Sequence, residues 1–244
     1  MQADGVETAL AFFTSTFSCY SGCRQYRENI FEAQQQIGEG APTVHKLRMC
    51  FNHPQFIEAA ADRVREAFRQ LPARNPDDIE ILFTAHSIPQ AMADNCNYQL
   101  QLAETCRLVA EQAGNEHWQL VFQSRSGPPS QPWLEPDVCD HLESVKQKGI
   151  NNVVIMPIGF VSDHMEVMFD LDIEAKEKCE ALGINMVRAG SVGVHPKFVS
   201  MIRELVLERM QGTPPTAIGR LPASHDVCPP NCCMSGRPGA VSPV

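Results

Sequence analysis

The chain has 244 residues, of which 43% are apolar, so it is long enough to bury a substantial core. Twenty basic against 29 acidic side chains give a net charge of −9 at pH 7, which opposes a phosphate-binding surface. We therefore expect no nucleic acid partner. The sequence contains no apolar run of about 18 residues, and its N-terminus lacks the pattern of a signal peptide. These features predict a folded cytoplasmic protein with at most peripheral membrane contact.

The ten cysteines allow two interpretations. In a small secreted domain they would indicate disulfides, but this chain is long and scatters most of them along segments with helical periodicity. We expect most of them to be reduced, buried thiols.

Apolar runs rich in β-formers alternate with segments of helical period, which is the pattern of βα units around a mainly parallel sheet. The fold class is therefore α/β. Strands are expected over residues 10–17, 44–49, 79–84, 118–123, 153–158 and 185–188. Helices are expected over residues 21–37, 54–71, 98–113, 136–148, 164–181 and 196–210.

Two changes of composition suggest boundaries. Residues 72–78 carry two prolines and several turn formers, which fits a boundary between domains. From Gly212 onward proline, glycine, serine and cysteine dominate, a composition that does not form a packed core. We expect a first α/β domain over 1–74, a second over 75–190, a helix over 191–211 and a cysteine-rich tail over 212–244.

His86 follows an apolar run that reads as a buried strand, and Pro89 prevents a helix from starting at once. Ligands of open α/β sheets bind at the carboxyl ends of the strands, where a neutral imidazole can accept protons. The alternative is a histidine whose ring is satisfied by backbone hydrogen bonds at the strand end.

Three carboxylates, Glu166, Asp170 and Glu174, are spaced four residues apart within an expected helix. This spacing places them along one helical face, where like charges destabilise the helix by about 0.2–0.5 kcal/mol per pair. Lining a cleft, such a row would take up protons or cations. The alternative is a solvated acidic face that nearby lysines partly neutralise.

Four motifs occur together in one order: TAHSIP at 84–89, FQSRSGP at 122–128, PWLEP at 132–136 and SDHME at 162–166. With the surrounding residues 10–210 they resemble ferrochelatase, the enzyme that inserts ferrous iron into a porphyrin. The resemblance implies two Rossmann-like, chelatase-type parallel-sheet halves, the first one truncated, followed by an irregular cysteine-rich tail. It also implies a lyase of haem biosynthesis whose partners are a porphyrin and ferrous iron.

By this resemblance His86 corresponds to the catalytic histidine and Glu166 to its acidic partner across the porphyrin. Both residues are also candidates for contact with the metal, and the division of proton removal and metal guidance between them stays open. Asp170 and Glu174 resemble the family's carboxylate ladder, whose oxygen ligands suit a hard and exchangeable ion. Both protoporphyrin IX and coproporphyrin III are retained as substrates.

The tail concentrates three thiols, Cys228, Cys232 and Cys233, in six residues. It resembles the tail of ferrochelatases that bind a [2Fe–2S] cluster, with Cys23 as the internal ligand and Cys19 as the reserve candidate. Four thiolates suit such a cluster. The alternatives are free thiols or a four-thiolate zinc site.

The chain departs from the family at its start, where an early strand and a glycine-bearing loop are expected. Part of the porphyrin pocket would then be lacking. The alternative function is a non-catalytic iron–sulfur or porphyrin-binding relic of the family.

Overall fold

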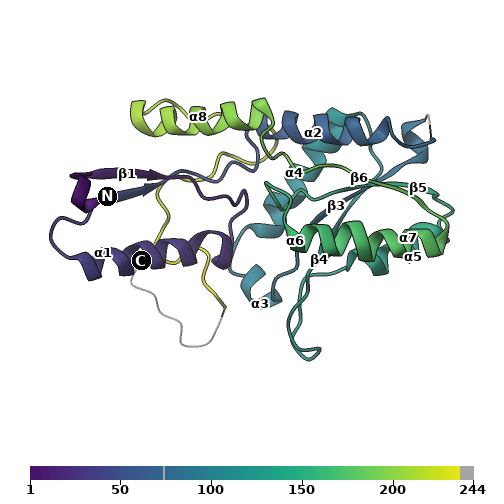
Figure 1. Cartoon of the computed structure of the whole chain (residues 1–244), viewed down its shortest axis with the longest axis horizontal. Coiled ribbons are helices and arrows are strands. Elements are labelled where there is room, and N and C mark those ends of the chain that lie inside the picture. The colour runs from purple at the N-terminus through teal and green to yellow at the C-terminus, as the bar shows by residue number, and fades with distance from the viewer. Residues whose placement is uncertain (74, 237–244) are drawn as a thin grey trace.

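The structure is a computed structural model that describes residues 1–73 and 75–236. Residue 74, at the expected domain boundary, and residues 237–244 of the expected tail lie outside the described residues. Strands and helices alternate along the chain and form one smaller and one larger parallel sheet (Figure 1).

The larger sheet has four parallel strands in the order β4-β3-β5-β6. They are β3 (Glu80–His86), β4 (Trp118–Gln123), β5 (Asn152–Met156) and β6 (Asn185–Arg188). Strand β3 pairs on both sides, and its side chains from Glu80 to Ala85 are buried. Its nearly continuous apolar run is typical of a central parallel strand covered on both faces.

Helices cover both faces of this sheet, which gives three layers (Figure 1). One face carries α2 (Pro54–Phe68) and α4 (Tyr98–Ala113), with α8 (Pro196–Gln211) packed on α2. The other carries α5 (Val138–Gln147), α6 (Met165–Val167) and α7 (Lys176–Leu182). Alternate residues of β3 serve the two layers, because Ile81 and Phe83 join one buried cluster and Leu82 joins the other.

The smaller sheet pairs β1 (Thr8–Ala11) with β2 (Thr43–Lys46) in parallel. Helix α1 (Gln25–Ile37) connects them, so this unit is one βαβ crossover. A short helix α3 (Gln90–Ala93) and the 3-10 turns Gln2–Asp4 and Pro76–Asp78 complete the regular structure, together with two π-helical segments. These are η2 (Tyr20–Arg24) before α1 and η4 (Met168–Ala175) between α6 and α7.

The expected strands over 118–123 and 185–188 and the expected helix over 98–113 are confirmed at the same bounds. The strand expected over 10–17 is wrong beyond Ala11, where the ladder with β2 ends at a hydrogen bond from Leu47. The apolar character of the following residues has another cause. Phe17 is buried in the main core although it lies in irregular chain.

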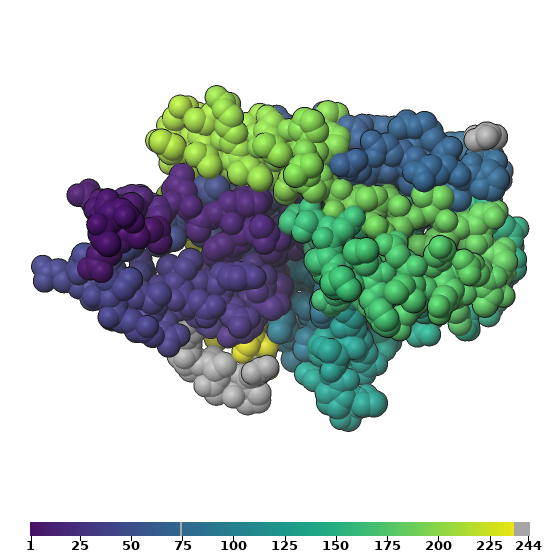
Figure 2. Space-filling model, viewed as in Figure 1, coloured from purple at the N-terminus to yellow at the C-terminus, as the bar shows by residue number. Residues whose placement is uncertain are grey.

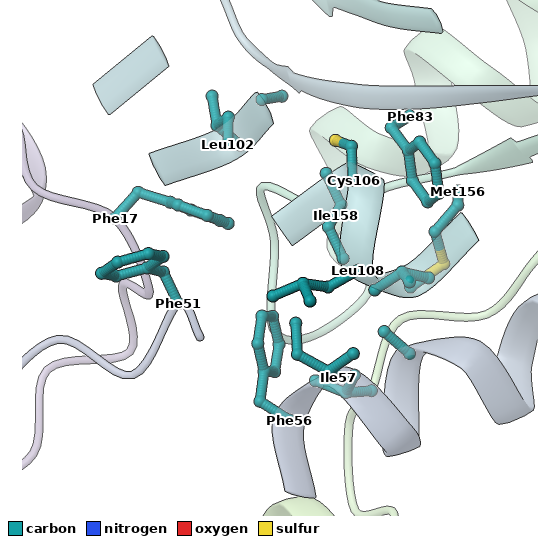
Figure 3. Packing of buried hydrophobic residues seen from close by; sticks show 14 of the residues in the cluster. Phe17, Phe51, Phe56, Ile57, Phe83, Leu102, Cys106, Leu108, Met156 and Ile158 are labelled. Carbon is teal, nitrogen blue, oxygen red and sulfur yellow. The ribbon is translucent and has the colours of Figure 1, made fainter. Parts of the chain in front are cut away.

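The main core joins the two sheets. Figure 3 shows Phe17 and Phe51, from the chain around the smaller sheet, in one cluster with Phe56, Phe83 and Met156. Helix α2 falls in the range 1–74 expected for the first domain, yet it packs on β5 and β6 of the larger sheet. The expected division at residues 74, 190 and 211 stays a prediction.

None of the ten cysteines, all of which lie in the described residues, forms a disulfide. Six of them are buried, among them Cys19, Cys23 and Cys233. Across residues 1–73 and 75–236, no helix combines the length and the apolar character needed to cross a membrane.

Candidate functional site

His86 is the last residue of β3, at the carboxyl end of the central strand. Its peptide carbonyl accepts a hydrogen bond of 3.0 Å from the buried Tyr98 hydroxyl, and the next residue, Ser87, bonds through Oγ to the Leu134 carbonyl at 2.8 Å. Both contacts fix the backbone on either side of the imidazole. The side chain itself is 37% exposed, so the imidazole ring is attached to a fixed backbone and faces open space.

The two ring nitrogens of His86 have different partners. Nδ1 lies 2.5 Å from the Ser87 carbonyl oxygen, which only accepts, so Nδ1 carries a proton and donates it. Nε2 lies 3.1 Å from Oε1 of Glu166. A hydrogen bond at this second contact requires one shared proton, carried either by the imidazolium or by the carboxylic acid. The backbone contact proposed as the alternative role of His86 is therefore present, but it occupies one nitrogen and leaves the other for chemistry.

Glu166 reaches His86 from the helical run that follows β5. His164 caps the start of this run, where its Nδ1 accepts a hydrogen bond of 3.5 Å from the Val167 amide. The Glu166 side chain is 44% exposed. A strand end and a helix start therefore bring together two groups that lie 80 positions apart in sequence.

Asp170 and Glu174 continue from Glu166 along the same run, which is π-helical from Met168 to Ala175. Asp170 is half-buried, and its Oδ2 accepts a bond of 3.0 Å from Gln123 Nε2 and a closer one from Ser124 Oγ. Glu174 is exposed. The three carboxylates thus follow one another along one helical run, and the middle one, which is less exposed than the other two, is anchored to the end of β4.

Ser124 has a backbone φ of 62°, which is uncommon for a residue with a side chain. This conformation ends β4 and turns the Ser124 hydroxyl toward Asp170. The FQSRSGP motif contains both hydrogen-bond donors to Asp170, a role that sequence alone does not reveal.

His86 lines a cavity of about 600 Å³ between the two sheets. Figure 2 shows a hollow between the purple N-terminal unit and the green and teal part of the chain. Phe17, Met92 and Trp133 contribute apolar walls, and the hydroxyl-bearing Ser15 adds a polar group. An apolar cavity with a few polar groups is the usual character of a small-molecule binding site.

The second candidate site contains four thiols. The side chain of Cys23 interacts with those of Cys228 and Cys233, and the side chain of Cys232 interacts with the same two residues, so the four thiols form a ring. The Cys232 and Cys233 sulfurs are 3.5 Å apart. Hydrogen bonds from Cys23 and Cys232 hold the pKa of Cys228 well below its usual range, and the bond to Cys228 raises the pKa of Cys23 to about 12. The structure therefore brings together all four cysteines selected from the sequence.

Arg24 fixes the tail against the rest of the protein. Its guanidinium is almost completely buried and donates to the carbonyls of Pro230 at 2.6 Å and Cys232 at 3.0 Å. The third partner is Glu28, whose carboxylate accepts a bond of 2.8 Å from Nε. The tail continues from Cys233 to the His86 cavity, where Ser235 forms part of the wall.

Cys19, the reserve candidate, has a different environment. Its sulfur accepts a hydrogen bond of 3.1 Å from the Gly22 amide and so caps the π-helical segment that carries Cys23. Burial raises the pKa of Cys19, and its side chain faces the His86 cavity. Cys19 takes no part in the sulfur ring.

His225 was not selected from the sequence, yet its Nε2 lies 3.5 Å from the Cys232 sulfur. The spacing of His225, Cys228 and Cys232, with two and three intervening residues, is a metal-ligand pattern that a search of the sequence can recognise.

Comparison with known proteins identifies the relatives of this chain. A family model described as Ferrochelatase matches residues 1–210. The ferrochelatase of Rhodopirellula baltica is 58% identical over 236 residues, which cover 96% of this chain and 67% of that protein. The coproporphyrin III ferrochelatase of Streptomyces coelicolor is 45% identical, with 100% of this chain and 72% of that protein covered. The chain thus spans 67–72% of the length of these two relatives.

Solved structures show a similar fold. SirB from Bacillus subtilis with Fe3+ superposes with a TM-score of 0.60 at 12% identity, covering 86% of this chain and 75% of that protein. A cobalt complex of the sirohydrochlorin chelatase SirB, from Bacillus subtilis subspecies spizizenii, gives a TM-score of 0.53. These matches confirm the expected chelatase-type α/β fold. The family model and the sequence relatives, which are lyases that insert a metal into a porphyrin, establish that the chain belongs to the ferrochelatase family.

Proposed function

We propose that this chain inserts ferrous iron into a porphyrin held in the cavity beside His86. The reaction replaces two pyrrole N–H protons with one Fe²⁺ ion and releases two protons. The observation that carries the proposal is the 3.1 Å contact between His86 Nε2 and Glu166 Oε1 at the edge of that cavity.

The pair is suited to take a proton from the porphyrin. Nδ1 of His86 already donates to the Ser87 carbonyl, so a neutral imidazole presents its Nε2 lone pair to the carboxylate of Glu166. Two facing acceptors at this distance repel each other. Uptake of one proton converts the repulsion into a charge-assisted hydrogen bond, which favours removal of a pyrrole proton.

The carboxylate row supports delivery of the metal. Glu166 and Glu174 are exposed, Asp170 between them is half-buried, and Glu166 contacts His86. Oxygen ligands suit a hydrated divalent ion that must leave again, whereas thiolates select softer metals and iron–sulfur clusters. Gln123 and Ser124 hold Asp170 in one orientation, so the middle position of the row is preorganised.

The four-thiol ring fits a [2Fe–2S] cluster, which we include in the proposal. The donor set consists of four cysteines, and the sulfurs of Cys23, Cys228, Cys232 and Cys233 already face one another. A bound cluster supplies one-electron redox chemistry. Arg24 places its charge beside the ring and holds the tail loop that carries three of the cysteines.

Coproporphyrin III and protoporphyrin IX remain the two candidate substrates, and the names of several relatives favour coproporphyrin III. The proposed role is a step of haem biosynthesis in the cytoplasm, a compartment that agrees with ten unpaired cysteines.

The proposal is tested by anaerobic insertion of Fe²⁺ into each porphyrin by the 244-residue chain. The His86→Ala variant is compared with His117→Ala, in which an exposed histidine outside the cavity is removed. We expect the wild type and His117→Ala to turn over and His86→Ala to lose at least about 100-fold in rate. Equal rates in all three proteins would reject His86 as a catalytic residue.

The same experiment tests the alternative function. If the folded wild type binds porphyrin, as measured by fluorescence quenching, but inserts no iron, the chain is a non-catalytic porphyrin-binding protein and the enzymatic proposal is rejected. The porphyrin that gives the faster turnover identifies the preferred substrate.

A further inference from the structure

The tail contains three potential metal ligands whose donor atoms lie close together. The ligand atoms of His225, Cys228 and Cys232 all lie within 4.8 Å of one another. Within residues 1–73 and 75–236, this is the one such group of three or more histidine, cysteine and acidic side chains. We propose that these three residues bind a single divalent ion of the zinc class in the chain that carries no iron–sulfur cluster.

The spacing of the donors matches a tetrahedral ion. Zinc binds sulfur at about 2.3 Å and imidazole nitrogen at about 2.0–2.1 Å, so two such ligands at a tetrahedral angle lie about 3.6 Å apart. The distance from His225 Nε2 to Cys232 Sγ is 3.5 Å. An ion can therefore bind both atoms with little movement of either side chain.

The donor types select the class of metal. One imidazole and two thiolates suit Zn²⁺ and similar borderline-soft ions, whereas Mg²⁺ and Ca²⁺ require oxygen ligands. The site therefore differs in chemistry from the carboxylate row beside His86, which offers only oxygen. The tail site would therefore select softer metal ions, and the carboxylate row would select harder ones.

The loop is held in this shape by contacts that do not involve a metal. The Cys232 amide donates to the Pro229 carbonyl at 3.1 Å, which closes a turn between the two ligand cysteines. The buried Arg24 guanidinium binds the carbonyls of Pro230 and Cys232 in the same turn. A site held in place before binding loses less conformational entropy when the ion arrives.

An ion has access to these ligands from solvent. His225 is exposed, and both His225 and Cys232 line a cavity of about 660 Å³. With three protein ligands, the fourth position of a tetrahedral ion is left for water, which is the arrangement of open rather than closed zinc sites. The cavity provides room for that water.

This single-ion site uses Cys228 and Cys232, two of the residues assigned to the cluster. The two forms of the tail therefore exclude each other, and a zinc-class ion would block cluster assembly. The inference itself does not depend on the cluster, because metal binding to the reduced, metal-free chain can be measured directly.

The test titrates the full reduced chain with Zn²⁺ against a chromophoric competitor, and with Co²⁺ to record thiolate charge-transfer bands. The wild type, His225→Ala and Cys233→Ser are compared, since Cys233 belongs to the ring but not to the proposed triad. We expect one ion per chain, a loss of affinity of at least about 10-fold in His225→Ala and little change in Cys233→Ser.

A rescue variant separates ligation from folding. His225→Cys should restore binding and add intensity to the cobalt–thiolate bands, while the circular dichroism of all variants should match the wild type. Failure of the wild type to bind Zn²⁺ would overturn the inference. So would full binding in His225→Ala together with loss of binding in folded Cys233→Ser, because that result assigns the ion to four thiolates.

Discussion

The guanidinium of Arg24 donates to the carbonyl of Cys232 at 3.0 Å, although the two residues are 208 positions apart in sequence. One arginine directly after Cys23 therefore fixes the loop that carries the other three thiols. Because a buried arginine cannot lose its charge, it requires these acceptors as much as the loop requires its donors.

Replacing this arginine should disturb the thiol site and leave the main core intact. In Arg24→Ala two carbonyls lose a charged donor, which costs about 1–3 kcal/mol of unfolding free energy. Urea denaturation measures this loss, and the rate of thiol modification reports opening of the loop. The matched control is Arg69→Ala, which removes an exposed arginine at the end of α2. Equal thiol reactivity in both variants would contradict the clamp.

The partner of His86 can be tested without changing its size. Glu166→Gln removes the charge that stabilises a proton on Nε2, so iron insertion should slow by about 100-fold to 10,000-fold. Porphyrin affinity, measured by fluorescence quenching, should change little. Glu177→Gln, which alters an exposed glutamate on α7, should keep the wild-type rate. A Glu166→Gln variant as fast as this control would remove Glu166 from the proton path.

A buried carboxylate ties the tail to α4 and should make its attachment sensitive to pH. Glu104 hydrogen-bonds to Arg107 at 2.9 and 3.0 Å and accepts a bond from the Arg220 amide. The bonds to Arg107 are the main cause that holds the pKa of Glu104 below its usual value of 4.5. The lowered pKa means that the ionised form stabilises the folded state at neutral pH, and that this stabilisation is lost as pH falls below 4.5 through the lower value.

We therefore expect Glu104→Gln to reduce the unfolding free energy by about 1.5–3 kcal/mol at neutral pH and by much less near pH 3. Urea denaturation at both pH values measures the difference. Glu111→Gln, whose side chain is 69% exposed, should show a small effect at either pH. A Glu104→Gln deficit that does not depend on pH would mean that packing, not charge, is lost.

Gly159 packs so closely against β3 that there is no room for a side chain at this position. A Cβ added there would lie 2.7 Å from the Ala85 Cα, directly before His86, whereas a Cβ at Gly190 would meet only the end of Arg63 at 4.0 Å. Gly159→Ala should cost about 1–3 kcal/mol through overpacking and should slow iron insertion by displacing His86. Gly190→Ala should retain stability and rate. Thermal melting and the insertion assay test both variants. A Gly159→Ala variant with wild-type stability and rate would show that β3 can move aside without loss of stability.

The sequence predicts best those elements that combine a clear hydrophobic periodicity with residues that mark where the element ends. Helix α4 ends at Gly114, whose positive φ of 76° marks the terminus, and β4 is a short apolar run next to turn formers. The sequence predicts a strand from Leu10 to Phe17, and the aromatic residues after Ala11 fit that prediction. Burial of Phe17 in the core explains those residues equally well, and no local pattern separates the two causes.

The same limit applies to the sites. His86 and Glu166 were found through their motifs and positions, and the resemblance to ferrochelatase supplied Cys23. The anchoring of Asp170 depends on the unusual backbone of Ser124, which the sequence does not announce. The role of Arg24 depends on a contact across the whole chain, and periodicity carries no information about such contacts.

The long separation between Arg24 and Pro230, 206 positions, also sets an order of events during synthesis. A ribosome adds about 5–20 residues per second, so about 10–40 s pass between the appearance of Cys23 and that of its sulfur partners. Throughout this interval the loop that carries the other three thiols has not yet been synthesised. Assembly of the thiol site is therefore a late event, and any metal that reaches Cys23 earlier meets an incomplete set of ligands.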